Sequence, residues 1–232
     1  RYGSGLFSRI GVLMPARRMD FNRIPFIGAY SVCTDKVCLI PERVNPRPDN
    51  TSVLGVPVLR ASASMSPLLG ILLAGNSNAL LCSHLFDLRL ASSPTEYDWH
   101  VEHVPGRLTA IGNLVLANDR GAVCSPELSK RTRRRVEEVL GVEVVPCTIG
   151  GLPYVGSLAV ATNKGVLAHP EITEEEKRLI EEVLRVRVEV GTVNGGVPFV
   201  SSGILANSKG AVVGSLTTGP ELVMISTALE VS

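Results

Sequence analysis

The side chains of this sequence that could act as nucleophiles or metal ligands are its cysteines and histidines. They are Cys33, Cys38, Cys82, Cys124 and Cys147, with His84, His100, His103 and His169. No two cysteines form a CxxC pair and none has a histidine at metal-ligand spacing, so no zinc site is expected. We predict buried thiols, no metal and no cofactor. A disulfide between neighbouring units stays open, because intracellular proteins of hyperthermophiles contain such bridges.

The elements that must position these side chains can be predicted from a sequence motif that occurs five times. Its clearest copies are residues 110–121 and 154–165. An anchor residue falls at Gly28, Gly70, Gly112, Gly156 and Ser201, and the polar turn after it begins at Thr34, Asn76, Asn118, Thr162 and Asn207. Both series advance by 42, 42, 44 and 45 residues. Because the anchor and the turn recur at the same intervals, the sequence indicates a repeat architecture that takes up nearly the whole chain.

Each unit is predicted to consist of strand, strand, helix and strand. Each unit opens with an apolar run that contains the anchor residue, and a second apolar run follows. These runs are short and aliphatic, which favours strands, as in residues 114–117. Asn118 to Gly121 has the composition of a four-residue hairpin turn. A proline followed by an acid then favours a helix start, and it occurs at Pro126, Pro170 and Pro220.

The helix of the fourth unit has the clearest signals. Thr173 and Glu176 are spaced as a capping box, and one apolar stripe at helical spacing follows. The stripe consists of Leu179, Ile180, Val183 and Leu184. It is expected to pack on the sheet.

A single unit of this size cannot bury its helix stripe and both faces of its sheet, so the units must pack on one another. A closed ring leaves no exposed sheet edge and is favoured over an open stack. We therefore expect a five-fold pseudosymmetric α/β propeller with strands inside and helices outside. Residues 21–232 form this single domain, and residues 1–20 are expected to be a flexible N-terminal extension.

Composition limits the classes of function. A formal net charge of +1 excludes a globally basic nucleic-acid binder but leaves a local basic patch open. The longest apolar run, residues 68–74, is far shorter than the roughly 20 residues that cross a bilayer. No membrane span is therefore expected.

Several stretches together resemble one known family. They are residues 110–114, 161–165 with His169 and Pro170, 191–194, 206–214 and 217–222. In these the chain, from about Phe21 to Leu229, is similar to archaeal and eukaryotic translation initiation factor 6. The sequence departs from that family in its first residues and in an unusual tail of the second unit, residues 85–99.

The resemblance implies the pentein propeller and a role without chemistry. It implies a cytoplasmic, monomeric factor that binds the joining face of the large ribosomal subunit, chiefly a ribosomal protein near the sarcin-ricin loop. The small subunit then cannot dock. It also implies release by a translational GTPase, which this chain does not encode, because it has no P-loop.

The same propeller carries guanidine-modifying enzymes, the deiminases and amidinotransferases, which use a cysteine, a histidine and acids. This alternative is weak, because no histidine here pairs with a cysteine in a recognisable pattern. His169 lies in a strand-to-helix link, where a structural role is the default. His100 and His103 flank Glu102. The favoured interpretation is that they are exposed side chains on a strand of alternating pattern rather than a pair of metal ligands.

A binding site is expected at the residue after each anchor, because these residues recur at one level of the ring. They are Ala29, Ile71, Asn113, Ser157 and Ser202. The resemblance places the ribosomal-protein contact at this level, and Asn113, Ser157 and Ser202, with Arg107 beside them, are the strongest candidates. The alternative is that Asn113 only satisfies a strand end.

The densest basic segment is residues 130–135. A solvated helix face, partly paired with Glu137 and Glu138, is one interpretation and is favoured. An auxiliary contact to rRNA is the other, through Lys130, Arg131, Arg133 and Arg134.

Overall fold

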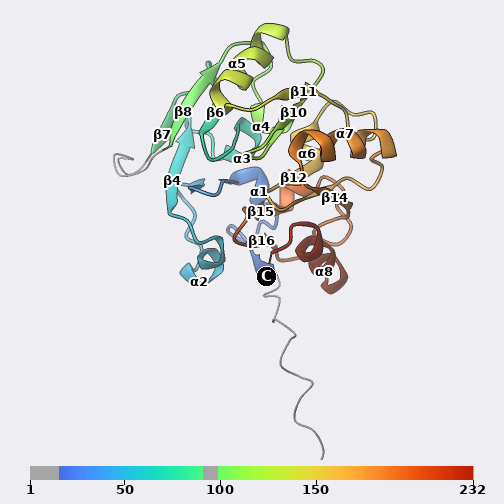
Figure 1. The fold of residues 1–232 in the computed structure, drawn as a ribbon. Coiled ribbons are helices and arrows are strands. Elements are labelled where there is room, and N and C mark those ends of the chain that lie inside the picture. Colours follow the sequence, from blue (N-terminus) through green and yellow to red (C-terminus); the bar gives the residue numbers. More distant parts are fainter. Residues whose placement is uncertain (1–15, 91–98, 232) are drawn as a thin grey trace, which may run out of the picture.

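The fold is a mixed α/β arrangement of five small sheets, each built around a hairpin (Figure 1). The computed structural model describes residues 16–90 and 99–231. The first two sheets contain β2 (Val32–Cys33), β3 (Cys38–Pro41), β4 (Val58–Ala63) and β7 (Leu88–Leu90), then β5 (Leu73–Gly75), β6 (Ala79–Ser83) and β8 (His100–Val104). The other three contain β9 (Val115–Ala117), β10 (Ala122–Cys124) and β11 (Val144–Pro146), then β12 (Ala159–Ala161), β13 (Gly165–Ala168) and β14 (Arg187–Val190), then β15 (Ile204–Ala206), β16 (Ala211–Gly214) and β1 (Arg17–Met19).

The helices fall into two groups. Five single-turn helices precede the hairpins: α1 (Ile27–Tyr30), α3 (Leu69–Leu72), α4 (Ile111–Leu114), α6 (Val155–Leu158) and the 3-10 helix η2 (Val200–Gly203). The others follow the hairpins: α2 (Pro48–Thr51) with η1 (Ser52–Leu54), α5 (Lys130–Leu140), α7 (Glu174–Leu184) and α8 (Gly219–Ala228). Over the described residues, no helix has the length and apolar character that spanning a bilayer requires.

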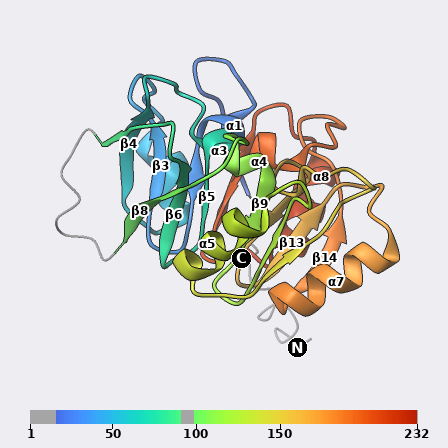
Figure 2. The same cartoon turned by 90° about the horizontal axis from the view of Figure 1, so that it is seen from above.

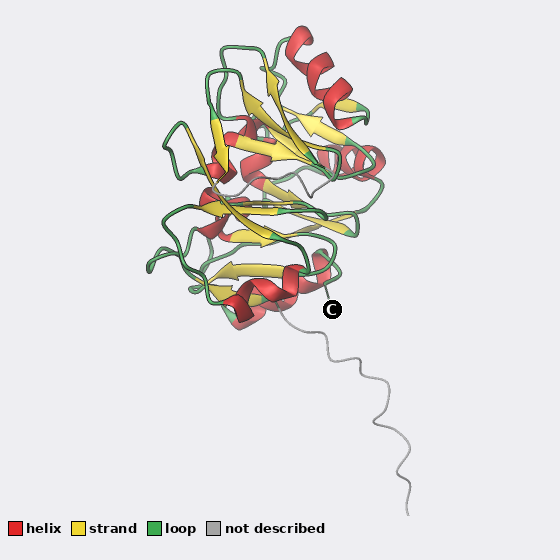
Figure 3. Ribbon diagram, turned by 90° about the vertical axis from the view of Figure 1, so that its left-hand side faces the viewer, coloured by secondary structure: helices red, strands yellow, loops and turns green. Residues whose placement is uncertain are grey.

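The predicted hairpins are confirmed. In each unit the first two strands pair antiparallel, as in Val115 with Cys124, and the third strand pairs parallel with the second. Cys82 and Cys124 hold the same hairpin position in neighbouring units and are fully buried, as expected. Figure 3 shows the strands running across the middle of the molecule.

The prediction of a strand around each anchor glycine was wrong, since these residues form the single-turn helices. Ile111 and Leu114 are both buried, three residues apart, as helical spacing requires. The glycines let the turns pack backbone to backbone. A Cβ on Gly112 would lie 2.0 Å from the carbonyl oxygen of Gly70, and one on Gly156 would lie 2.0 Å from that of Gly112. Only glycine allows this approach.

The single-turn helices contact one another in chain order, and η2 contacts α1. Figure 1 shows them gathered in the middle, with α2, α5, α7 and α8 at the rim. Helices therefore lie both at the centre and outside, which corrects the expectation of helices outside only. The first strands of the hairpins and the anchor glycines line a central cavity of about 110 Å³.

The start of the chain completes the fifth sheet. Strand β1 pairs parallel with β16, so that Met19 lies opposite Gly214 and is buried. The predicted extension through residue 20 therefore extends too far, because its residues 17–19 supply the third strand of the last unit. Residues 1–15 lie outside the described part of the chain.

The second unit differs from the predicted pattern. The described residues between β6 and β8, which are 84–90 and 99, form no helix. Part of this tail is instead β7, which pairs antiparallel with β4 and becomes a fourth strand of the first sheet. The rest of the tail, residues 91–98, lies outside the described residues.

The helix starts were predicted correctly in part. The capping box of Thr173 and Glu176 on α7 is confirmed, and the apolar stripe after it packs in the core. Pro220 lies in the first turn of α8 as expected. Pro126 and Pro170, however, lie in tight turns, so α5 and α7 begin four residues later, after the caps Ser129 and Thr173.

Buried asparagines in three of the five hairpin turns join their unit to the next. Their side-chain oxygens accept hydrogen bonds from backbone N–H groups of their own turn, as in Asn118 Oδ1 from Arg120 and Gly121. Their Nδ2 atoms donate to two carbonyls of the next unit, one in its turn and one at its helix end. The pairs are Asn76 to Asn118 and Leu140, Asn118 to Thr162 and Leu184, and Asn207 to Thr34 and Leu54, at 2.8–3.2 Å.

Threonine replaces asparagine in two turns. Thr34 and Thr162 still accept the turn bonds through Oγ1 but have no amide with which to reach the next unit. The threonine turns therefore keep the hydrogen bonds within the turn but lack those to the next unit.

Replacing Asn118 with threonine should remove the bonds between units and keep the turn. We expect a loss of about 1–3 kcal/mol in the free energy of unfolding, since two buried carbonyls lose donors. Asn118→Ala should cost more, because it also removes the turn acceptor. Denaturant titrations of the three proteins measure this, and an Asn118→Thr variant as stable as the parent would contradict it.

Candidate functional site

The five predicted binding residues lie on one face, here called the short-helix face, which comprises the single-turn helices and the loops that lead into them. Each occupies the third position of its helix and is half-buried. Each donates its backbone N–H to the carbonyl of the residue that caps that helix, at 2.9–3.2 Å. The pairs are Ala29 with Phe26, Ile71 with Leu68, Asn113 with Ala110, Ser157 with Tyr154, and Ser202 with Phe199. Contacts between the helices bring these residues together.

The capping residues are the part of this face that sequence reasoning missed. Phe26, Tyr154 and Phe199 are 40%, 44% and 44% exposed, although each opens an apolar run. The signal was present, because a proline precedes each of them and also Leu68. Proline has no N–H to donate to a neighbouring strand, so a proline directly before an apolar run argues against a central strand there. Exposed aromatic residues on a fixed backbone are typical anchors of a protein interface.

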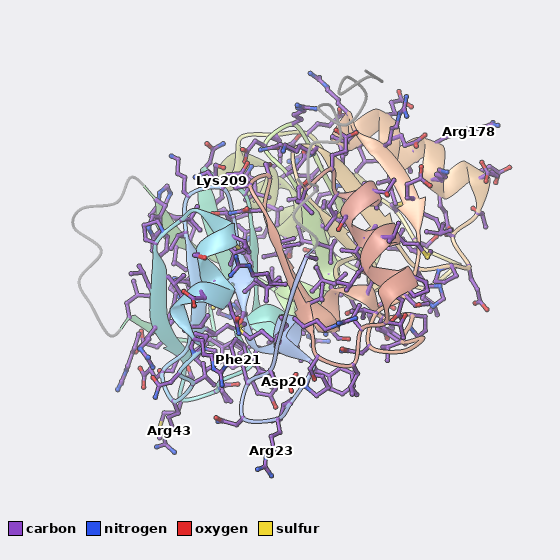
Figure 4. The ribbon with its side chains drawn as sticks, turned by 90° about the horizontal axis from the view of Figure 1, so that it is seen from below. Asp20, Phe21, Arg23, Arg43, Arg178 and Lys209 are labelled. Atoms are coloured by element: carbon purple, nitrogen blue, oxygen red, sulfur yellow. The ribbon has the colours of Figure 1, made fainter. Side chains whose placement is uncertain are left out.

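Tight turns extend the face. Asn22–Arg23 and Ser64–Met65 have positive φ at both central residues, between 47° and 69°. Glycine normally takes such positions, so side chains there are retained at some cost. Met65 is 86% exposed, and Arg23 points away from the body of the molecule (Figure 4).

Two carboxylates brace the loops of the fourth and fifth units. Glu176 accepts hydrogen bonds from Thr148 Oγ1 and from the backbone N–H of Gly150, at 2.6 and 2.8 Å. Glu221 repeats this arrangement with Thr192 Oγ1 and Gly196, at 2.7 and 2.8 Å. The glycine turns that these carboxylates hold lead directly into Tyr154 and Phe199. Each carboxylate therefore fixes the loop that precedes an exposed aromatic residue.

These bonds change the acidity of both groups. Burial alone raises the pKa of each carboxyl, but the hydrogen bonds outweigh it and lower the pKa of Glu176 and of Glu221 to about 2. Both groups are therefore ionised across the physiological range.

His169 supports the same region. It is buried, its Nδ1 accepts a hydrogen bond from the N–H of Glu171, and its ring meets Phe199 edge-on with centroids 6.1 Å apart. This is the structural role expected of it.

The other predicted residues lie elsewhere. Arg107 is exposed in the loop between β8 and α4, where it lines a small pocket with Glu127 and Ser129. Lys130, Arg131 and Arg134 line a groove between α5 and the second sheet, whereas Arg133 is not among its lining residues. The predicted pairing of α5 with its own acids is seen for Arg135 with Glu138 at 3.6 Å, and Glu137 has no ion pair among the described residues.

The thiols lack the features of a nucleophile. Burial raises the pKa of Cys82, Cys124 and Cys147 to about 11 and that of Cys33 well above its usual value. Within residues 16–90 and 99–231, no cysteine is hydrogen-bonded to a histidine, and no cluster of acids, cysteines and histidines could hold a metal ion. A thiolate nucleophile requires the opposite shift.

The fold and this face define an α/β protein of five small sheets that presents a candidate surface for binding. A family model described as the eIF-6 family matches residues 16–228. A protein of Thermococcus gammatolerans called translation initiation factor 6 is 51% identical over 93% of this chain and 98% of its own. Proteins of the same name from Pyrococcus furiosus and Nitrosopumilus maritimus are 48% and 46% identical, over 93% and 91% of this chain and 99% and 97% of theirs. The chain belongs to the eIF-6 family.

Replacing Glu221 with glutamine should destabilise the protein in a way that depends on pH. The native pKa lies below its ordinary value, so the ionised group stabilises the fold above about pH 4.5 and loses this effect as pH falls towards 2. We expect Glu221→Gln to cost about 1–3 kcal/mol at pH 7 and progressively less below pH 4.5. Denaturant titrations between pH 7 and pH 2.5 test this.

Glu174→Gln is the matched control, because Glu174 is an exposed acid in the first turn of α7. It should change stability by less than about 0.5 kcal/mol at any pH. A Glu221→Gln protein whose stability follows the same pH profile as the parent would overturn the assignment.

Proposed function

We propose that this chain is a five-fold pseudosymmetric α/β propeller of the pentein type that binds the large ribosomal subunit at its joining face. It prevents the small subunit from associating by occupying that face. The action needs a rigid, shape-matched surface and no chemistry, so the chain is not an enzyme in this proposal. Membership of the eIF-6 family and the names of its relatives support the connection with translation initiation.

The short-helix face is the proposed contact. The observation that carries this is an exposed aromatic residue beside a half-buried polar one in both the fourth and the fifth unit, namely Tyr154 with Ser157 and Phe199 with Ser202. Stable interfaces combine such anchors with hydrogen-bonding groups around them and bury on the order of 1,000 Å² or more in total. Asn113 supplies the polar group in the third unit.

The partners follow from the family resemblance. We propose that the face meets a ribosomal protein on the joining face, in the vicinity of the sarcin-ricin loop, and that a translational GTPase releases the factor. The protein acts in the cytoplasm as a monomer. Arg107 lies in the loop that leads into α4, at the border of the contact.

A guanidine-modifying enzyme is the alternative function. It would need an activated cysteine, and the raised pKa values of the buried thiols do not favour one. Arginine turnover by the purified chain would support this alternative.

Two substitutions on the short-helix face should weaken binding to purified large subunits. Asn113→Arg adds a bulky charge to the face, and Phe199→Ala removes an anchor. Each should lower affinity about tenfold or more and allow more subunits to join. Sedimentation with separated subunits, followed by joining at raised magnesium, measures both effects.

Arg178→Ala on α7 is the control, since that side chain points outward at the rim (Figure 4). It should leave affinity unchanged. Full binding and full inhibition of joining by both face variants would contradict the proposal.

A further inference from the structure

Helices α5 and α7 are equivalent elements of neighbouring units with opposite surface charge. Each has 11 residues, begins after a hydroxyl cap and ends in the same four letters, Glu-Glu-Val-Leu. Val136 and Leu140 of α5 are buried at the positions of Ile180 and Leu184 of α7. Both helices therefore bury apolar side chains at the same positions. Figure 2 shows them on the outside of neighbouring sheets.

The first turns differ in a way that core packing does not explain. Helix α7 begins with Glu174, Glu175 and Glu176, whereas α5 begins with Lys130 and Arg131 and has no acid in its first turn. Acids stabilise a helix N-terminus and bases destabilise it. Like charges four residues apart, as in Lys130 with Arg134, destabilise the helix further. Helix α5 therefore retains these charges at the expense of its own stability.

The charges of α5 line one side of a groove of about 700 Å³ between the helix and the second sheet. The lining residues are His84, His103, Pro105, Lys130, Arg131, Arg134, Arg135 and Glu138. Glu102 and Glu138 pair with Arg135, at 2.6 and 3.6 Å. Among the described residues Lys130, Arg131 and Arg134 have no acidic partner, so three positive charges remain available.

The two histidines form the opposite wall. His84 Nδ1 lies 3.3 Å from the carbonyl oxygen of Val104, and His103 Nε2 lies 3.0 Å from that of Phe86. Among the described residues, the lining contains no Phe, Tyr or Trp. Proteins that bind single strands stack bases on such side chains, so this groove suits a phosphate backbone rather than unpaired bases.

We propose that this groove binds the phosphate backbone of double-helical RNA. Duplex RNA is recognised mainly by its shape and by contacts to phosphates and 2′-hydroxyls, which cationic side chains on one helix face can supply. The choice of RNA over other polyanions rests on the proposed ribosomal function. The groove is a second contact, separate from the short-helix face.

Fluorescence polarisation of the full chain with a labelled 16-base-pair RNA duplex tests the proposal. The double variant Lys130→Glu/Arg131→Glu should lose at least tenfold in affinity at 100 mM salt and show a flatter dependence of affinity on salt concentration. Its thermal midpoint should rise by about 2–5 °C, because the reversed charges suit the helix N-terminus. A gain in stability with a loss of binding distinguishes a functional surface from a structural one.

Arg178→Glu on α7 is the matched control, since Arg178 holds the place of Arg134 in the equivalent helix. It should bind the duplex as the parent does. Unchanged binding by the double variant, or tighter binding of the parent to the single strand or to a DNA duplex than to duplex RNA, would overturn the proposal.

The two proposals can fail separately. Asn113→Arg should keep its affinity for the RNA duplex, because the substitution lies outside the groove. If that variant also lost the duplex, the groove would not be an independent site. If the double α5 variant kept the duplex while Asn113→Arg lost the large subunit, only the groove would be rejected.

Discussion

The structure depends on hydrogen bonds that buried turn asparagines make from one unit to the next. Asn118 Nδ2 lies 3.1 Å from the Thr162 carbonyl and 2.9 Å from that of Leu184, so one side chain satisfies a turn and a helix end together. Asn207 makes the same contacts to the first unit. Three of the five turns carry such an asparagine, and the bonds from Asn207 join the last unit to the first.

With the units joined in this way, the backbones of their single-turn helices pack against one another at the centre. The anchor glycines let single-turn helices approach until a Cβ would collide with a carbonyl, as between Gly156 and Gly112. Such a centre cannot easily deform. The aromatic residues that cap these helices are therefore presented in fixed positions, and the carboxylates of Glu176 and Glu221 hold the loops beside them. A rigid face suits the proposed action, in which the protein acts by occupying a surface.

Local signals in the sequence allowed part of this fold to be predicted. The hairpin turns follow from asparagine and glycine at fixed spacing, and the capping box of α7 from Thr173 and Glu176. Both depend on residues close together in the chain. The single-turn helices were mistaken for strands, because four apolar residues around a glycine suit either conformation. Packing against the neighbouring unit decides between them.

Long-range pairings could not be predicted in this way. Strand β1 pairs with β16 across nearly the whole chain, and no local pattern in residues 17–19 indicates it. Strand β7 joins the sheet of the preceding unit for a similarly non-local reason. For the site, recurrence placed Asn113, Ser157 and Ser202 on one face. It missed Phe26, Tyr154 and Phe199, because apolar residues that open a strand-like run are usually buried.

The central claim is that the short-helix face is the surface that meets the ribosome. Amide hydrogen exchange, followed by mass spectrometry for the chain alone and with purified large subunits, tests it most directly. The account predicts slower exchange in peptides covering residues 22–30, 64–72, 106–114, 150–158 and 195–203, with the hairpin turns at 118–121 and 162–165 unchanged. Protection confined to the hairpin turns, or none anywhere, would contradict it.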